Sequence, residues 1–369
     1  MKSDPRIAFV LDALPAVGGA EKVLLTALEA YPQADVFTLI YNRPAFQGTP
    51  IASLNVHTSY LDRLPFAQKH HRLFLPLMLR AIERLDLQGY DVIVSFTYAV
   101  AHGIHNPNRA RHIAYTYTPM RYAWAGLNVN GTPTRKNPLI QHFMDSFRTW
   151  DRQAASRVHD FAAISEAVAC RIKNAWRRKS RLIYPPVETE RFQSFHLRGD
   201  YFITISRLVP HKRIDLLVRA FSQLQLPLVI VGDGPEFPRL KALASSNIHL
   251  TGFLPDERVA ELIMKARAFV SAAEEDFGIA MVEAQAAGCP VIAYGRGGAL
   301  ETVTDGVTGL FIEEQSVGGI KEAVQKFEIQ ADSFCREDLV RNACRFGKDR
   351  FVREFIQFVE GEDNFSKLY

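Results

Sequence analysis

Residues 274–301 read EEDFGIAMVEAQAAGCPVIAYGRGGALE, and their pattern indicates how the second half of the chain is built. An apolar, alanine-rich segment at 279–287 has helical composition and stops at Gly288. Residues 290–294 then form a short apolar run that ends in glycines. Because glycine marks loops, the stretch predicts a loop, a helix, a strand and a second, glycine-rich loop. This is one αβ unit of an α/β domain.

The loop before this helix has the features of a ligand site. Gly278 allows a ligand to approach the backbone where the free N–H groups of a helix begin, and a helix N-terminus attracts phosphate. Glu275 precedes the helix and Glu283 lies a turn and a half inside it, so both carboxylates can face one ligand and accept hydrogen bonds from sugar hydroxyls. The same spacing also fits an ordinary αβ unit with two surface glutamates.

Residues 275–303 resemble the donor-site signature of the retaining glycosyltransferases of the GT4 family. The resemblance implies the GT-B fold: two Rossmann-like α/β domains, a cleft between them, and a C-terminal helix that crosses back to the N-terminal domain. It also implies that Glu283 binds the ribose hydroxyls. The donor sugar would be held by Glu275 and by the backbone of Phe277, Gly278 and Ile279.

Composition and length are those of a soluble globular protein with two domains. The chain has 369 residues, of which 47% are hydrophobic and 23% are charged. The formal net charge of +4 suits anionic ligands or an anionic membrane surface and is too small to indicate nucleic-acid binding. The N-terminal sequence lacks the basic start of a signal peptide, and no apolar run is long enough to span a membrane. The four cysteines form no CxxC pair, so we expect a reducing cytosol and neither disulfides nor metal ligation.

The first half of the chain begins with a short apolar strand at 7–11, followed by Gly18, Gly19 and an amphipathic stretch at 22–30. A strand, a glycine loop and a helix suit phosphate, although the spacing is not GxGxxG and a tight βα turn is the alternative. The loop resembles the first N-domain loop of GT4 enzymes, which lies against the donor phosphates and the acceptor.

A strand at 111–118 leads into Pro-Met-Arg-Tyr-Ala-Trp at 119–124. This segment resembles a GT4 subgroup that builds bacterial polysaccharides and often uses GDP-mannose. In that subgroup the matching segment usually has the sequence HTPMRYAWD, and an earlier strand ends in the sequence SHAVAKG. In this chain Tyr117 and Tyr98 replace its two histidines, Ala125 replaces its aspartate and His102 replaces its lysine. By the resemblance Tyr117 lies near the reacting sugar, although tyrosine does not titrate at neutral pH. The resemblance places Arg121 and Tyr98 on the acceptor side.

Two basic segments each allow two interpretations. Residues 61–85 combine an apolar side with lysine, histidine and arginine, so they could lie on a membrane interface or form a core-facing helix with a solvated basic flank. Residues 171–181 carry six cations and no acid, which fits a solvated helix face or a contact with anionic lipid.

Pro185 and Pro186 make a rigid extended segment, and we place the linker at about 184–198. The predicted domains are 1–190 with a C-terminal helix at about 346–369, and 191–345. In the second domain Arg207 and Lys212 flank a loop at the carboxyl end of a strand, where they could neutralise a diphosphate or be surface charges. The GT4 resemblance places both on the donor diphosphate. It assigns Gly232, Phe253 and Leu254 to donor binding as well.

The predicted function is that of a retaining hexosyltransferase, with mannose from GDP-mannose favoured, acting on a lipid-linked or polysaccharide acceptor. No two aspartates have DxD spacing, so we expect no metal and no cofactor, with Arg207 and Lys212 stabilising the leaving group. The family resemblance implies a same-face substitution in which the leaving phosphate takes the acceptor proton. We expect a cytoplasmic location, with peripheral contact at the inner membrane face as an option. The alternatives are a catalytically silent GT-B module that binds a nucleotide sugar or a partner, and a transferase with a small soluble acceptor.

Overall fold

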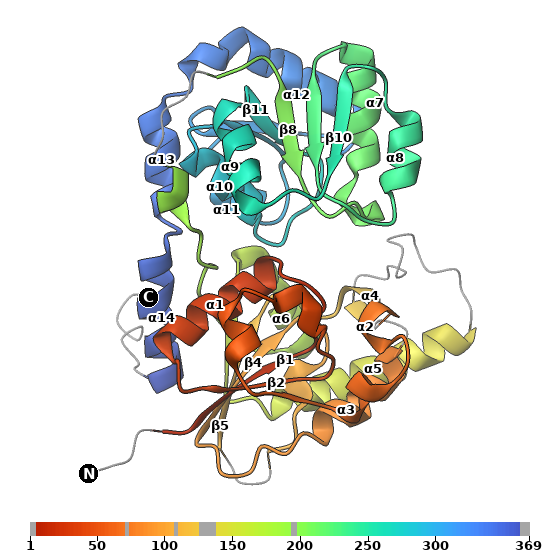
Figure 1. The fold of residues 1–369 in the computed structure, drawn as a ribbon, viewed down its shortest axis with the longest axis vertical. Helices are drawn as coiled ribbons and strands as arrows, with labels where there is room; N and C mark the ends of the chain where they lie inside the picture. Colours follow the sequence, from red (N-terminus) through yellow and green to blue (C-terminus); the bar gives the residue numbers. More distant parts are fainter. Residues whose placement is uncertain (1–4, 71–73, 107–109, 125–137, 193–197, 362–369) are drawn as a thin grey trace. The chain divides into compact units, whose positions relative to one another are not determined.

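The computed structural model describes residues 5–70, 74–106, 110–124, 138–192 and 198–361 (Figure 1). The chain divides into two compact units. Of these described residues, the first contains those in 5–124, 138–186 and 349–361, and the second contains those in 187–348. The main chain therefore passes between the units at 186/187 and 348/349, where the sequence analysis placed boundaries at 190/191 and 345/346.

The first unit is built on a sheet of seven parallel strands in the order β3-β2-β1-β4-β5-β6-β7. The chain adds strands on one side of β1 and then crosses to the other side at β4. This reversal is a topological switch point, the place where open α/β sheets bind ligands beyond the carboxyl ends of their strands. The strands are β1 (Ile7–Leu11), β2 (Asp35–Thr38), β3 (Val56–Thr58), β4 (Val92–Thr97), β5 (Arg111–Thr116), β6 (Asp160–Ala163) and β7 (Arg181–Leu182).

Alternation along β1 explains how helices cover both faces of this sheet. Ala8 and Val10 join a buried cluster that includes Ile82 and Phe147 from the helices, whereas Phe9 points to the opposite face. The helices of the unit are α1 (Gly19–Ala30), α2 (Ala67–His70), α3 (Leu75–Glu83), α4 (Arg121–Trp124), α5 (Pro138–Ser156), α6 (Glu166–Trp176) and α14 (Lys348–Glu360).

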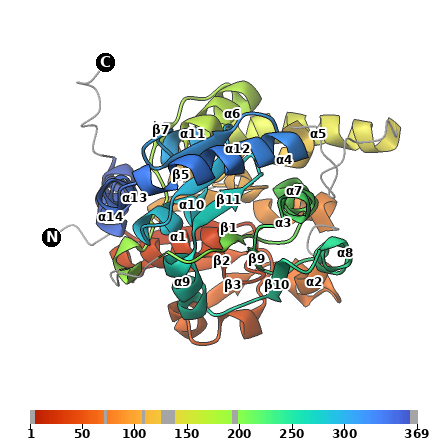
Figure 2. The ribbon, with the colours of Figure 1, turned by 90° about the horizontal axis from the view of Figure 1, so that it is seen from above.

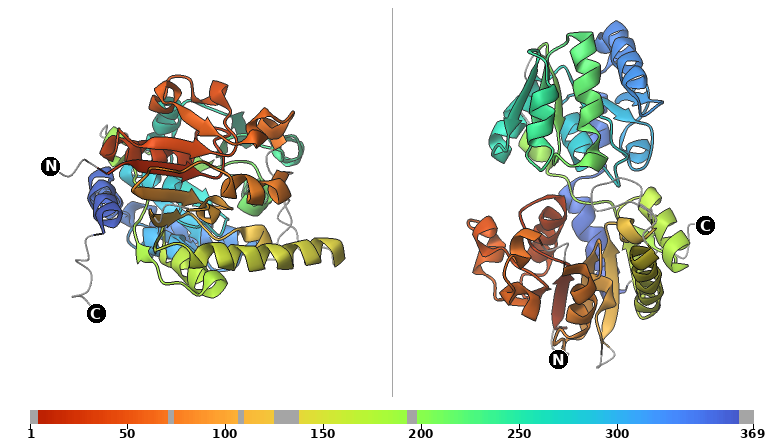
Figure 3. Two further views of the ribbon diagram at one scale, coloured as in Figure 1. Left: turned by 90° about the horizontal axis from the view of Figure 1, so that it is seen from below. Right: turned by 90° about the vertical axis from the view of Figure 1, so that its right-hand side faces the viewer.

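The C-terminal helix α14 belongs to the first unit, as the predicted fold requires. It lies beside the strands of that unit in both views of Figure 3. Its Phe355 ring packs 6.1 Å from the ring of Phe9 and 5.8 Å from that of Phe96, and Phe351 meets Tyr115 edge-on at 5.8 Å. These apolar side chains anchor α14 on the face of the first sheet.

The second unit contains six parallel strands in the order β10-β9-β8-β11-β12-β13. The order matches that of the first six strands of the other sheet, with the switch point between β8 and β11. Two Rossmann-like sheets are therefore present, which confirms the predicted fold class. The strands are β8 (Phe202–Ile205), β9 (Leu228–Val231), β10 (Ile248–Gly252), β11 (Ala268–Ser271), β12 (Val291–Tyr294) and β13 (Gly309–Ile312).

Helices cover both faces of the second sheet, and Figure 2 shows α7 and α9 on opposite sides of its strands. Phe202 of β8 packs edge-on against Phe221 at 5.2 Å and Phe327 at 6.0 Å, so α7 and α12 share one face. The helices are α7 (Ile214–Leu224), α8 (Phe237–Leu243), α9 (Asp256–Lys265), α10 (Ile279–Ala286), α11 (Ala299–Thr302), α12 (Val317–Gln330) and α13 (Arg336–Cys344).

Replacing Phe355 by alanine should destabilise the first unit by roughly 3–5 kcal/mol, because it removes a fully buried ring from the aromatic cluster. All three tryptophans, Trp124, Trp150 and Trp176, belong to this unit, so tryptophan fluorescence during urea unfolding reports its stability. Arg353→Ala, at an exposed position of the same helix, is the control and should change the midpoint little. An unchanged midpoint for Phe355→Ala would show that α14 does not stabilise the unit.

Candidate functional site

The switch point of the second sheet brings together two predicted site residues. Lys212 lies after β8 in a short 3₁₀ turn, η7 (Pro210–Lys212), and Glu275 follows β11. The Nζ atom of Lys212 donates to both carboxylate oxygens of Glu275, at 2.7 and 2.6 Å. The neighbouring strands thus deliver one cation and one carboxylate to the same point.

The Lys212–Glu275 pair is largely shielded from water, since the side chains are 20% and 18% exposed. An ion pair with little solvent contact is screened less than a surface pair. Lysine has three N–H donors and a carboxylate has about four acceptor positions, so both groups retain capacity for a ligand that carries phosphate and hydroxyls. Arg207 precedes Lys212 by five positions, is exposed, and makes no ion pair within the described residues.

The backbone around Glu275 is fixed by direct contact with the glycine loop after β12. The N–H of Gly298 donates to the carbonyl of Glu275 at 2.8 Å. A Cβ on Gly298 would lie 2.4 Å from the Cα of Phe277, and Gly297 has φ +63° with the Glu275 carbonyl 2.3 Å from its Cβ position. Only glycine fits at this approach. The buried Phe277 ring packs against Phe346 at 5.3 Å.

Helix α10 begins directly after this contact. Its N-cap residue, Gly278, has φ +93°, and Gly278 and Ile279 are partly exposed. The first N–H groups of a helix have no partner within the helix and favour anions. The helix start therefore adds donors beside the Lys212–Glu275 pair, which is the arrangement expected for a diphosphate.

The structure gives Glu283 a partner that the sequence analysis missed. Glu283 lies within α10 with its side chain 12% exposed, and its Oε1 accepts from Nη2 of Arg191 at 2.8 Å. Arg191 belongs to the 3₁₀ turn η6 (Thr189–Phe192), which starts the second unit. The two residues are 92 positions apart, and no local pattern signals such a pair.

Three further predicted donor residues, Gly232, Phe253 and Leu254, follow β9 and β10 at the carboxyl ends of these strands. Gly232 has φ +132°, and a Cβ there would lie 1.9 Å from the carbonyl oxygen of Ser206, so the loop after β9 packs on the loop after β8. Phe253 follows β10 and is 79% exposed, and Leu254 beside it is partly buried. An exposed aromatic ring at this edge of the sheet is available for stacking on a base.

In the first unit, the switch point is occupied by a buried carboxylate. Asp12 follows β1 and accepts backbone N–H bonds from Tyr98 at 2.7 Å, Ala99 at 3.0 Å and Ala101 at 2.7 Å, with a further bond from Val100. Burial raises the pKa of the Asp12 carboxyl, and these N–H donors oppose that shift. The loop that carries Tyr98 is thereby tied to β1.

Tyr117 supports the glycine loop of the first unit. Its hydroxyl donates to the carbonyl of Ala20 at 2.8 Å, in the first turn of α1, which begins at Gly19 with Gly18 as N-cap. Burial raises the pKa of Tyr117 well above its usual value, and neighbouring Tyr115, Glu21, Tyr98 and Asp12 raise it further. The phenol therefore stays protonated at neutral pH and acts as a hydrogen-bond donor.

A second buried cluster in the first unit fixes α4, which begins at Arg121. The His102 ring lies 3.1 Å from Thr97 through Nδ1 and 3.0 Å from Asp151 through Nε2. The other oxygen of Asp151 accepts from the indole N–H groups of Trp124 at 2.7 Å and Trp176 at 2.5 Å. Asp151 thus connects α4, α5 and α6, and the sequence analysis did not single it out. Ala125 lies outside the described residues.

The structure describes parts of both basic segments. Residues 61–66 are not part of a continuous helix: they lie in the 3₁₀ turn η3 (Tyr60–Arg63) and in the residues after it, where Phe66 is 74% exposed at φ +63°, and α2 begins only at Ala67. Met78 and Ile82 of α3 face the core whereas Leu77 is exposed, and residues 71–73 lie outside the described part of the chain. In the other segment, α6 ends at Trp176 with Arg177 as its C-cap residue, and Arg178 donates to the carbonyls of residues 155, 158 and 159.

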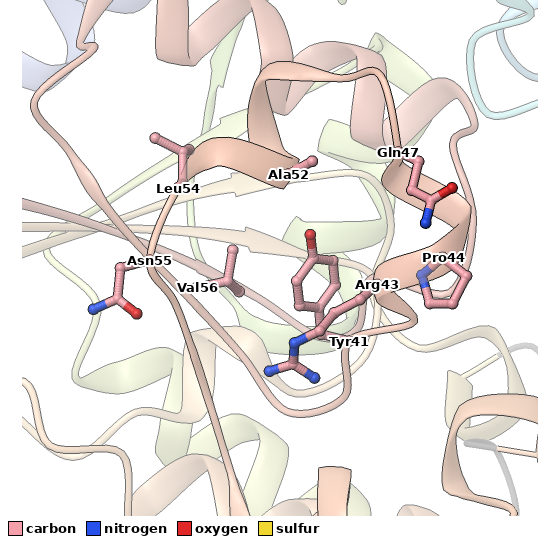
Figure 4. A pocket seen from close by; sticks show the side chains of 8 residues that line it. All are labelled: Tyr41, Arg43, Pro44, Gln47, Ala52, Leu54, Asn55 and Val56. Atoms are coloured by element: carbon pink, nitrogen blue, oxygen red, sulfur yellow. The ribbon is translucent and has the colours of Figure 1, made fainter.

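A surface hollow of about 350 Å³ lies beside the edge strand β3 of the first unit (Figure 4). Arg43 stacks 5.0 Å from the Tyr41 ring there and pairs with Asp62 at 3.0 Å. The hollow contains none of the predicted site residues. Its lining consists of Tyr41, Arg43, Pro44, Gln47, Ala52, Leu54, Asn55 and Val56.

Among the described residues there is neither a metal-binding cluster nor a membrane-spanning helix. No group of three or more histidine, cysteine, aspartate or glutamate side chains there could hold a metal ion. No helix in the same residues has the length and apolar character needed to cross a membrane.

Two glycosyltransferase families match the chain, one in each half. Residues 17–191 match Glycosyltransferase Family 4, and residues 187–345 match Glycosyl transferases group 1. The two matches together run from the glycine loop before α1 to the end of α13 and contain every predicted site residue.

Relatives at modest identity also carry glycosyltransferase names. The GDP-mannose-dependent alpha-(1-6)-phosphatidylinositol monomannoside mannosyltransferase of Mycobacterium tuberculosis is 32% identical over 201 residues, which are 46% of this chain and 52% of the relative. The D-inositol 3-phosphate glycosyltransferase of Mycobacterium sp. is 32% identical over 155 residues, 38% of this chain and 35% of the relative. At best, the chain spans about half the length of these two curated relatives.

Solved structures share the fold over almost the whole chain. Anabaena Alr3699/HepE in complex with UDP aligns with a TM-score of 0.72 and 18% identity, over 96% of this chain and 100% of that one. Sucrose-phosphate synthase from Thermosynechococcus elongatus aligns with a TM-score of 0.74 and 16% identity, over 96% and 98%. At these identities the likeness shows the fold.

Gly298→Ala should open the contact between the two loops at Glu275, because its new Cβ cannot fit 2.4 Å from the Cα of Phe277. We expect a loss of roughly 1–3 kcal/mol and faster amide exchange at 275–278, measured by hydrogen exchange with mass spectrometry. Gly318→Ala, where a Cβ meets nothing closer than 3.7 Å, is the control. Native exchange at 275–278 in Gly298→Ala would contradict the contact.

Proposed function

The chain belongs to the GT4-type glycosyltransferases, and we propose that it transfers a hexose, with mannose from GDP-mannose favoured, to a lipid-linked or saccharide acceptor with retention of configuration. The observation that carries this proposal is the shielded Lys212–Glu275 pair at the switch point, 2.6–2.7 Å across, beside the start of α10. This position provides positive charge for a leaving diphosphate and a carboxylate for a sugar in one place.

The chain's own residues supply what the leaving group needs. As the bond between the anomeric carbon and the phosphate oxygen breaks, negative charge grows on the diphosphate. Lys212, Arg207 and the first N–H groups of α10 would stabilise it without a metal. The acceptor oxygen forms its bond to the anomeric carbon on the same face, and its proton passes to the leaving phosphate oxygen. Glu275 would then orient the sugar by accepting from its hydroxyls.

GDP-mannose is the favoured donor for two reasons. The Pro-Met-Arg-Tyr-Ala-Trp segment at 119–124 resembles a subgroup that often uses it. Relatives from Mycobacterium, Mycolicibacterium and Corynebacterium are named GDP-mannose-dependent mannosyltransferases. The exposed Phe253 ring provides a stacking surface for the base.

A lipid-linked acceptor would bring the first unit to a membrane. Phe66, Tyr60 and Leu77 are exposed apolar side chains, and the Tyr60 hydroxyl reaches the carbonyl of Leu77 at 3.4 Å, so these two are neighbours. Phe66 stays exposed in a backbone conformation that non-glycine residues rarely adopt, which is commonest at functional positions. Arg63 and Arg80 add positive charge. We propose peripheral contact with anionic lipid through this surface.

Lys212→Ala and Arg207→Ala should each lower kcat/KM for the donor roughly ten- to a hundredfold, because each removes a charge-assisted hydrogen bond to phosphate worth about 1.5–3 kcal/mol. The measurement is release of nucleoside diphosphate from GDP-mannose in the presence of acceptor. Lys241→Ala, on the exposed side of α8, is the control, and EDTA should leave the rate unchanged. Native kinetics in both variants would refute the diphosphate assignment, and loss of activity with EDTA would refute the metal-free mechanism.

Tyr117→Phe should lower turnover, because the phenylalanine cannot donate to the carbonyl of Ala20 and the glycine loop loses a support. If this position instead serves by proton transfer, Tyr117→His should raise activity from a low base. The three proteins are compared with one donor. Equal rates in all three would show that position 117 has no part in the chemistry. Nucleotide-sugar binding without turnover in every variant would favour the silent-module alternative.

Phe66→Ser should weaken binding to vesicles of phosphatidylglycerol and phosphatidylcholine roughly ten- to a hundredfold, because insertion of the exposed ring contributes about 1.5–3 kcal/mol. Co-sedimentation measures the bound fraction. Ile329→Ser, at an exposed apolar position of α12 in the second unit, is the matched control. Equal vesicle binding by wild type and Phe66→Ser would remove this surface from the membrane contact and favour a small, soluble acceptor.

A further inference from the structure

The guanidinium of Arg191 joins three elements of the second unit. Its Nη2 donates to Oε1 of Glu283 on α10 at 2.8 Å, and its Nη1 lies 3.4 Å from Oδ2 of Asp256, the first residue of α9. The same group stacks 4.6 Å from the ring of Phe192. A planar guanidinium with five donors can make these contacts at once, and a lysine ammonium cannot.

This contact differs from an ordinary surface ion pair. The side chains of Arg191 and Glu283 are 20% and 12% exposed, whereas that of Asp256 is 57% exposed. A carboxylate largely removed from water needs a cation close to it. Glu283 sits inside a helix with a buried face, and Arg191 approaches it from η6, outside that helix. The strong half of the contact is therefore Arg191–Glu283, and Asp256 is the weaker, solvated half.

The position of the Arg191–Glu283 pair along α10 relates the pair to the ribose of a bound nucleotide donor. Glu283 is five residues beyond Gly278, so it lies about 7.5 Å along the axis from the helix start at a rise of ~1.5 Å per residue. If the diphosphate sits at the helix start, the ribose of the same nucleotide falls beside Glu283. Asp256 begins α9 two positions after Leu254, so it directly follows the loop that the base would contact.

We propose that Arg191 is a positioning residue for nucleotide recognition: it holds the Glu283 carboxylate so that it can accept hydrogen bonds from the ribose hydroxyls, and it links that carboxylate to the base-side loop through Asp256. This inference rests on the proposed function, since it requires a nucleotide donor. A carboxylate has acceptor positions for about four hydrogen bonds, so the bond from Arg191 is compatible with bonds from hydroxyls. The function that follows is preference for a ribonucleotide over a 2′-deoxyribonucleotide.

The test is the ratio of dissociation constants for nucleotide pairs, GDP with 2′-deoxy-GDP and UDP with 2′-deoxy-UDP, by calorimetry on the full chain. Wild type should prefer the ribonucleotide of the pair that it binds by roughly tenfold. Arg191→Ala and Glu283→Gln should each bring this ratio of dissociation constants close to one. The double variant should give the same ratio as either single variant. Arg191→Lys keeps the positive charge and the fold but loses the contact with Asp256. It should retain part of the preference for the ribonucleotide.

The control is Arg258→Ala, which removes an exposed arginine paired with Glu261 on α9 and should leave the ratio as in wild type. A purely structural role would lower the melting temperature of Arg191→Ala and Arg191→Lys while preserving the wild-type ratio, and this outcome overturns the proposal alone. A wild-type protein that binds neither GDP nor UDP overturns the proposed function together with it.

Discussion

The ion pair between Lys212 and Glu275 is the interaction on which the candidate donor site depends. The residues come from the ends of β8 and β11, strands that are neighbours only because the strand order reverses between them. When two opposite charges are largely shielded from water, separating them or removing one of them leaves an uncompensated charge, which costs free energy. A bound diphosphate would offer the lysine a stronger anion, and the carboxylate could then turn its acceptor capacity to sugar hydroxyls.

The two units place different chemistry at equivalent points of the same topology. In the first unit, Asp12 occupies the switch point and is engaged by four backbone N–H groups, so its hydrogen-bonding capacity serves the fold. In the second unit, Glu275 faces the ammonium of a flexible side chain, which a ligand can displace. We infer that the carboxylate at each switch point is structural where its partners are backbone N–H groups, as for Asp12, and available to a ligand where its partner is an exchangeable cation, as for Glu275.

Local patterns predicted the elements well and long-range side-chain pairs poorly. The helix and strand read from residues 274–301 appear as α10 and β12, because glycine and proline mark their limits in the sequence itself. Residues 61–85 looked like one amphipathic stretch in the sequence. In the structure the helical pattern is interrupted at Phe66, whose left-handed backbone conformation no sequence pattern indicates. Arg191 with Glu283, and Asp151 with His102, meet only because the sheets bring distant segments together. Family resemblance suggested Glu283, but it did not indicate the cation that holds it.

Sugar transfer at the Lys212–Glu275 site is tested by the anomeric configuration of the product, followed by proton NMR while the protein acts on a panel of nucleotide sugars with a saccharide or lipid-linked acceptor. We expect that one donor, GDP-mannose before the others, is consumed with release of its nucleoside diphosphate and that the new bond keeps the α configuration of the donor. A β-linked product would contradict the same-face mechanism. Failure to consume any donor of the panel would contradict the claim that the Lys212–Glu275 site catalyses sugar transfer.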